Sequence, residues 1–152
     1  MSHVPAKIVM PKNKQPLFID TSIFIYLFED HTRFGPILGN LFEDLSKGKF
    51  SGITSVITVS EVLTKPYQNH DHDLIIQYQD IFTHLPHLKV ASFSFEAAVR
   101  AAQIRARYEF KMLDSIQLAI AYLEGCKSFL TNDKELTKFK NLSILYLENL
   151  IK

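Results

Sequence analysis

The chain contains a single cysteine, Cys126, among its 152 residues, so no disulfide can form within it. A lone cysteine is typical of proteins kept in a reducing cytoplasm, and we expect this one to be a small buried hydrophobe. No apolar run reaches the roughly 18 residues that a membrane span needs. The first residues, Met1 to Lys7, lack the apolar core of a secretion signal. We therefore expect a cytoplasmic protein with no membrane association.

The chain also lacks a strong net charge, internal repeats and low-complexity tracts. Its 17 basic and 16 acidic residues leave a formal charge of +1, so no overall field attracts nucleic acid. The length and an apolar content of 47% predict one globular domain with a proper core. Residues 1–16 contain three prolines, which resist regular structure. We expect a flexible leader over 1–16 and a single domain over 17–152.

Short apolar runs alternate with segments of helical periodicity along the rest of the chain. The expected strands are 17–19, 53–56, 89–93, 128–131 and 144–147. The expected helices are 21–29, 36–47, one from residue 58 that stops before Pro66, 74–85, 94–110, 114–124 and 134–139, with 67–73 as a polar loop. This alternation predicts an α/β domain with a central, mostly parallel sheet of about five strands, covered by helices on both faces.

Four acidic residues stand next to the ends of these runs. Asp20 and Asp133 follow expected strands, while Glu61 and Asp114 lie near the starts of expected helices. In open parallel sheets, ligands bind beyond the carboxyl ends of the strands. Carboxylates that crowd together repel each other unless a divalent cation neutralises them. The set therefore predicts a Mg²⁺ or Mn²⁺ site, and such a site favours phosphate chemistry.

Each acid also has a simpler explanation as a helix cap. Asp20 suits an N-cap position after a strand, and Asp114 suits the positive end of a helix dipole. Two capping boxes are predicted, Thr58 with Glu61 and Asn132 with Glu135. Capping does not, however, require all four acids to fall at the same edge of a sheet.

Polar groups beside two of the acids favour the metal site. Ser22 follows Asp20, while Thr131 and Asn132 precede Asp133. Hydroxyl and amide groups in these places can orient a carboxylate or a bound water.

Four segments, in order, resemble the motifs of PIN-domain ribonucleases, and more narrowly those of VapC-type toxins from toxin–antitoxin pairs. They are Phe18-Ile19-Asp20-Thr21-Ser22, Thr54 to Val62, Leu113 to Ala121 and Phe129 to Asp133. The resemblance covers residues 17 to about 148. It implies a three-layer α/β/α domain and a Mg²⁺- or Mn²⁺-dependent endoribonuclease that cleaves single-stranded or structured RNA. It also implies an antitoxin partner and a homodimer.

The resemblance also implies roles for individual residues. The catalytic, metal-holding acids would be Asp20, Glu61, Asp114 and Asp133, and the polar supports would be Ser22, Thr131 and Asn132. A metal-activated water would attack phosphorus and leave a 5′-phosphate and a 3′-hydroxyl. The segment from Tyr108 to Met112 departs from the family in lacking its usual glycine and proline, and Ser115 stands where alanine is usual.

Binding RNA requires positive charge around an acidic pocket. Arg107, Lys111 and Lys134 are the candidate phosphate contacts, because they lie nearest the acids in sequence. The alternative for each is a solvated helix surface. Phe24, Phe28 and Phe42 are expected in the core, with an exposed face for a dimer or antitoxin as the alternative.

Three other interpretations remain at this stage. A PIN-like module without catalysis would only bind RNA or a protein. A phosphatase of the haloacid-dehalogenase type needs an aspartate two residues after Asp20, where Ser22 stands. Residues 70–73, with two histidines and two aspartates, are expected to be a solvated loop rather than a nickel or zinc site.

Overall fold

Five parallel strands form the centre of the molecule. The computed structural model describes residues 8, 15–29 and 31–151. The strands are β1 (Leu17–Ile19), β2 (Gly52–Ser55), β3 (Leu88–Ala91), β4 (Ser128–Thr131) and β5 (Ser143–Tyr146). They pair in the order β3-β2-β1-β4-β5, and each of the four pairings is parallel. The predicted α/β class and five-stranded parallel sheet are confirmed.

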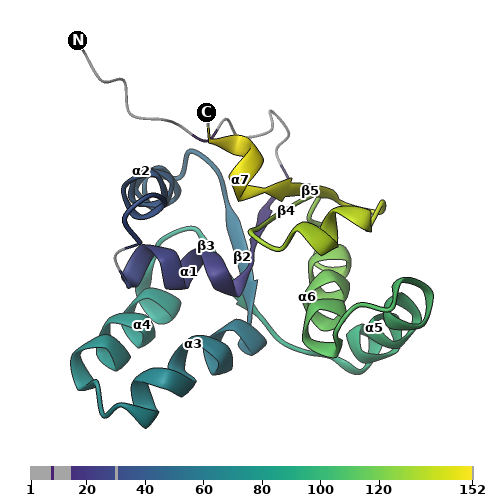
Figure 1. Cartoon of the computed structure of the whole chain (residues 1–152), viewed down its shortest axis with the longest axis horizontal. Coiled ribbons are helices and arrows are strands. Elements are labelled where there is room, and N and C mark those ends of the chain that lie inside the picture. The colour runs from purple at the N-terminus through teal and green to yellow at the C-terminus, as the bar shows by residue number, and fades with distance from the viewer. Residues whose placement is uncertain (1–7, 9–14, 30, 152) are drawn as a thin grey trace.

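Helices cover both faces of this sheet. They are α1 (Thr21–Phe28), α2 (Gly35–Ser46), α3 (Val56–Gln68), α4 (His72–His84), α5 (Phe95–Tyr108), α6 (Met112–Leu123) and α7 (Leu147–Leu150), with a 3-10 turn η1 (Lys134–Lys138). Helices α1 to α4 lie on one side of the strands, and α5 and α6 lie on the other (Figure 1). The molecule is therefore a three-layer α/β/α sandwich.

Side-chain alternation along the central strands divides the core between the two faces. In β1, Leu17 and Ile19 pack on the side of α1 and α2, whereas Phe18 packs on the side of α5 and α6. Phe18 stacks on Phe129 of β4 with ring centroids 4.9 Å apart. Because both faces are covered, β1 is apolar throughout, and every residue of β2 and β4 is buried as well. Cys126 is buried on the α6 side, as predicted.

The prediction that Pro66 ends a helix is wrong. Pro66 lies inside α3, two residues before its end, and is buried. A proline removes one backbone donor, and burial of its ring helps to offset that cost. The following loop is shorter than predicted, because Asp71 caps α4 by accepting a hydrogen bond from the Leu74 amide at 3.2 Å. Residues 70–73 thus form a turn and a helix start.

Both predicted capping boxes are also wrong. Helix α3 begins at Val56 with Ser55 as its N-cap, so Thr58 and Glu61 lie within the helix. Asp133, rather than Asn132, caps η1 by accepting from the Glu135 amide at 3.0 Å. Glu61 is therefore free of the capping role that competed with a functional one.

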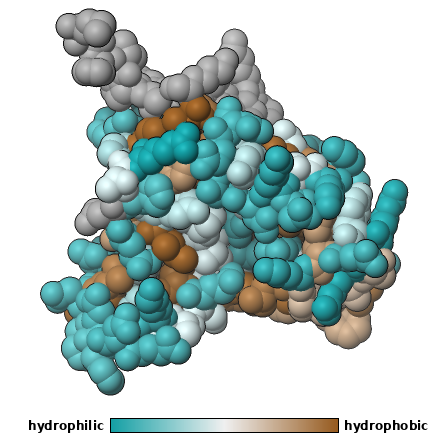
Figure 2. Space-filling view, in the orientation of Figure 1, coloured by the Kyte–Doolittle hydropathy of each residue, from teal (hydrophilic) through white to brown (hydrophobic). Residues whose placement is uncertain are grey.

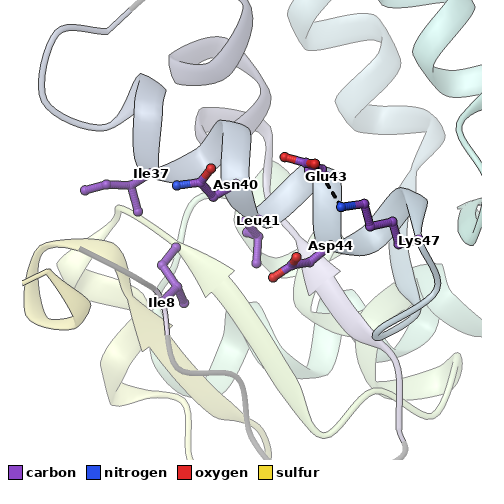
Figure 3. Close-up of a pocket in the computed structure, with 7 residues that line it drawn as sticks. All are labelled: Ile8, Ile37, Asn40, Leu41, Glu43, Asp44 and Lys47. Carbon is purple, nitrogen blue, oxygen red and sulfur yellow. Dashed lines mark hydrogen bonds and ion pairs between the residues drawn. The ribbon is translucent and has the colours of Figure 1, made fainter. Parts of the chain in front are cut away.

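The expected leader is described at Ile8 and from residue 15 onward. Ile8 is partly buried against the core on the α2 side. With Ile37, Leu41 and Asp44 it lines a groove of about 250 Å³ beside α2 (Figure 3). The remainder of residues 1–14 lies outside the described part, so the flexible leader stays a prediction.

Phe24, Phe28 and Phe42 are the three phenylalanines expected in the core. Phe24 and Phe42 are buried in the core, and Phe28 is partly buried beside them. None of the described helices is long and apolar enough to cross a membrane.

Candidate active site

The four acids come from elements that meet at one place in the sheet. Asp20 follows β1, and Asp133 lies two residues after the end of β4, the neighbouring strand. The chain runs from β1 to β2 on one side of β1, whereas β4 lies on its other side. This reversal of strand order is the point where open α/β sheets bind ligands. Glu61 approaches from α3 and Asp114 from the first turn of α6.

Asp20 is held at this point by several donors. Its Oδ1 accepts from the Thr21 amide at 2.9 Å, and its Oδ2 accepts from the Thr131 hydroxyl at 2.7 Å. Burial raises the pKa of Asp20 to about 6, although these hydrogen bonds act to lower it. The charges of Asp114 and Glu61 raise the pKa further. A buried carboxylate with this pKa is stabilised in its charged form by a nearby cation.

The other acids belong to the same electrostatic group. Burial raises the pKa of Asp114, and the charge of Asp133 is the next largest cause. The Lys111 ammonium opposes this rise, while Glu61 adds to it. Because each carboxylate acts on its neighbours, the pocket carries a concentration of negative charge.

The donor set fits a hard cation without forming a closed cage. Among the described residues, no three acidic, histidine or cysteine side chains are close enough to make a metal-binding cluster. Mg²⁺ keeps several waters and takes only one or two carboxylates directly, so an open arrangement of oxygens suits it. Ser22 Oγ is buried and has no hydrogen-bond partner in the described part of the chain. It is an oxygen left available beside Asp20.

A buried amide links the acids. Gln117 lies on α6, one turn after Asp114, and is 1% exposed. Its Nε2 lies 2.7 Å from Thr58 Oγ1, and 3.4 Å from both Asp20 Oδ1 and Thr21 Oγ1. Its Oε1 accepts a hydrogen bond from Ser55.

The network ends at Glu61. Thr21 Oγ1 donates to Glu61 Oε1 at 2.7 Å and lies 3.2 Å from Thr58 Oγ1. Thr21 therefore touches two of the acids, Asp20 through its amide and Glu61 through its hydroxyl.

The sequence matches the model of the PIN domain over residues 17–142. This chain belongs to the PIN-domain family. Among curated proteins, none matches the sequence significantly.

Solved structures similar to this PIN domain include toxin–antitoxin proteins. VapBC2 of Rickettsia felis, bound to promoter DNA, matches with a TM-score of 0.69 and 19% identity, over 85% of this chain and 96% of its own. A toxin–antitoxin complex from Klebsiella pneumoniae matches with a TM-score of 0.61 and 25% identity, over 86% and 95%. VapC20 of Mycobacterium tuberculosis, a toxin that cleaves the sarcin–ricin loop, matches with a TM-score of 0.65 and 16% identity, over 80% and 93%. The PIN domain thus shares the fold of these toxins.

The predicted polar supports have different surroundings in this PIN domain. Thr131 contacts Asp20 directly and accepts from the Asp133 amide at 3.1 Å. Asn132 instead donates to the Tyr26 hydroxyl at 3.1 Å, and its Oδ1 has no partner among the described residues. Thr131 is thus the support that connects two of the acids.

Sequence reasoning missed Gln117, Thr21 and Thr58. All three are polar residues that are buried beside the acids. Gln117 could have been identified from the sequence, because it is the one polar residue in an otherwise apolar run from Ile116 to Ala121. A polar side chain on the core face of a helix needs a hydrogen-bond partner, and here that partner is the acidic site.

A basic cavity lies between α5, the end of α6 and residues 139–141. Arg100 and Arg107 line about 210 Å³ of space together with Tyr108, Tyr122 and Asn141. The Arg100 guanidinium lies 4.9 Å from the centre of the Tyr122 ring, and that of Arg107 lies 5.6 Å from that of Tyr108. Neither arginine forms an ion pair with a described residue. Both guanidinium groups keep donors for an anionic ligand.

Lys111 and Lys134 lie closer to the acids. Lys111 is exposed at the N-cap of α6, and its charge lowers the pKa of Asp114. Lys134 is exposed at the start of η1, next to Asp133. Positive charge therefore borders the acidic pocket.

Proposed function

We propose that this PIN domain is a Mg²⁺- or Mn²⁺-dependent endoribonuclease, the toxin of a VapBC-type pair acting in the cytoplasm. The observation that carries the proposal is the meeting of four acids at the switch point of the sheet, where burial and neighbouring charge raise the pKa of Asp20 to about 6. Structural ion pairs would lower that pKa instead. The negative charge of the acids is therefore not balanced by an ion pair among the described residues, and a divalent cation would balance it.

Asp20, Asp114 and Asp133 are the residues that would hold the ion, one or two of them directly and the rest through its bound waters, with Glu61 as a further ligand or as the residue that positions water. The ion, when bound, lowers the pKa of a coordinated water and so supplies a nucleophile near neutral pH. The chain's own contribution is positioning. Thr131 and the Thr21 amide fix the two oxygens of Asp20, and Thr21 fixes Glu61 Oε1. The other oxygen, Glu61 Oε2, has no hydrogen-bond partner among the described residues and would accept a proton from water.

Incubation of the pure protein with total RNA tests the proposed function. With Mn²⁺ or Mg²⁺ we expect discrete RNA fragments whose new ends are 5′-phosphate and 3′-hydroxyl. Addition of EDTA should stop the reaction, excess Mn²⁺ should restore it, and Asp20→Asn should yield no fragments. RNA that binds but stays intact under all conditions would support the PIN-like module without catalysis.

RNA phosphates are the proposed ligands of the basic side chains. Lys111 and Lys134 border the acids, so they suit the phosphates next to the scissile bond. Arg100 and Arg107 lie on α5 and line a cavity with two tyrosines and none of the four acids, which suits a nucleotide away from the scissile bond. Arginine binds phosphate in a bidentate manner, and tyrosine rings stack on bases.

Arg107→Ala is expected to raise KM for RNA and leave kcat unchanged, because it removes one phosphate contact in a cavity that none of the four acids lines. The slope of log KM against log salt concentration should fall in size by about 1. Steady-state cleavage of a labelled RNA at several salt concentrations measures both quantities. Arg105→Ala is the matched control, since Arg105 is exposed on α5 but does not line the cavity. Equal effects of the two variants would contradict a specific role for Arg107.

An antitoxin and a second copy of the chain are the proposed protein partners. The Klebsiella pneumoniae and Rickettsia felis structures are toxin–antitoxin complexes, which supports the first. Apolar residues gather over α1, next to the hydrophilic surface of α3 and α4 (Figure 2). Ile25, Leu27 and Phe28 of α1 are only partly buried. Such a face suits an apolar segment of a partner.

A further inference from the structure

Gln117 is a buried polar residue, and both polar atoms of its side chain, Oε1 and Nε2, have hydrogen-bond partners. Ser55 donates to Oε1, and Nε2 lies within 2.7 Å of Thr58 Oγ1 and 3.4 Å of Asp20 Oδ1. Three separate elements, β2, α3 and the turn after β1, therefore meet at one amide on α6. A side chain needed only for packing at this position would be apolar, like its neighbour Leu118.

The direction of the hydrogen bonds follows from the chemistry of the groups. Thr21 Oγ1 donates its one hydroxyl hydrogen bond to Glu61 Oε1, at 2.7 Å. The Thr21 oxygen is then the acceptor for Thr58, 3.2 Å away. Because the Thr58 hydroxyl hydrogen is used in the hydrogen bond to Thr21, the Thr58 oxygen accepts a hydrogen bond from another donor.

Gln117 Nε2 is that donor, at 2.7 Å from Thr58 Oγ1. Reversal of the amide would place Oε1 against the Asp20 carboxylate, an acceptor facing an acceptor. The orientation of Gln117 is thus fixed, and every hydrogen bond from Gln117 to Glu61 runs in one direction.

We propose that Gln117 is a positioning residue that acts through Thr58 and Thr21 to hold the Glu61 carboxylate beside Asp20. Without the amide donor, the Thr58 oxygen no longer accepts from Gln117, and Thr21 becomes free to donate to Thr58 rather than to Glu61. Glu61 would then take other rotamers, because no other hydrogen bond to its side chain is present among the described residues. The effect of Gln117 on the reaction rate, though not on the position of Glu61, rests on the proposed nuclease function.

Gln117→Met tests the proposal, since methionine has a similar length and no donor. We expect a crystal structure of the variant to show Glu61 released from Thr21, and kcat for RNA cleavage to fall by about tenfold to a hundredfold with KM unchanged. Leu118→Met is the matched control: it places the same residue at the adjacent buried position of α6 and should leave both Glu61 and kcat unchanged.

Thr21→Val and Thr21→Ser test the last link independently, and they serve if Gln117→Met does not fold. Valine removes the hydroxyl and should reproduce the displacement of Glu61 and the fall in kcat, whereas serine retains the donor and should preserve both. A crystal structure of Gln117→Met or Thr21→Val with Glu61 in its original place would overturn the proposal, whatever the activity. An unchanged kcat with a displaced Glu61, in a wild type that cleaves RNA, would also overturn it. A wild type that does not cleave RNA refutes the proposed function, while the position of Glu61 still decides the role of Gln117.

Discussion

Asp114→Asn is expected to lower the rate of RNA cleavage by about a thousandfold, a loss like that of a major electrostatic contact in other active sites. Asparagine has almost the same shape, so the α6 helix should keep its packing. The change removes the negative charge that faces Asp133 and Glu61, and with it a ligand for the proposed cation. Binding of the cation should weaken in parallel, because the charge is lost from the site itself.

Single-turnover cleavage of a labelled RNA with saturating Mn²⁺ measures the rate, and circular dichroism checks that the variant is folded. Asp80→Asn is the control, since Asp80 is an exposed aspartate on α4 whose ion pair is with His84. It should cleave at the wild-type rate. An Asp114→Asn protein that is folded and fully active would exclude Asp114 as a metal ligand.

The division into strands and helices could be predicted because the relevant signals are local. The apolar run 17–19 and the other short apolar runs mark buried strands. Their alternation with segments of helical periodicity indicates that the strands are parallel. The strand order was not predicted, since it depends on which buried faces fit together. Pro66 shows a limit of local rules: a proline near a helix end disfavours the helix, yet α3 continues through Pro66, which is buried.

The convergence of the four acids was predictable for a different reason. Asp20 and Asp133 each follow a strand, and in a parallel sheet such positions converge. Gln117 and Thr58 could not be assigned in this way, because their role depends on contacts between residues 59 positions apart. The capping pattern at Thr58 and Glu61 was misleading. Ser55 is the N-cap of α3, so Thr58 and Glu61 lie within the helix and their side chains are available to the site.

The metal-free protein is expected to lose stability as the pH rises through the range in which Asp20 ionises. The pKa of Asp20 is about 6 in the folded state and 3.8 in its ordinary environment. Between these values the folded state holds a proton that the unfolded state has released, so the free energy of unfolding falls as pH increases. The total loss is about 3 kcal/mol, and it is complete above the folded pKa. Mg²⁺ should reverse it, because the cation stabilises the ionised carboxylate.

Urea unfolding in EDTA, at intervals from about pH 4 to about pH 7, measures this loss, and Asp20→Asn isolates the contribution of Asp20. The asparagine cannot ionise, so its stability relative to the wild type should increase with pH and level off above about pH 6, where the wild type carries the buried charge. Asp73→Asn, which changes an exposed aspartate of α4, should follow the wild type throughout. A constant difference between Asp20→Asn and the wild type across this range would mean that Asp20 keeps an ordinary pKa. In that case burial at the switch point would not create the unpaired negative charge on which cation binding depends.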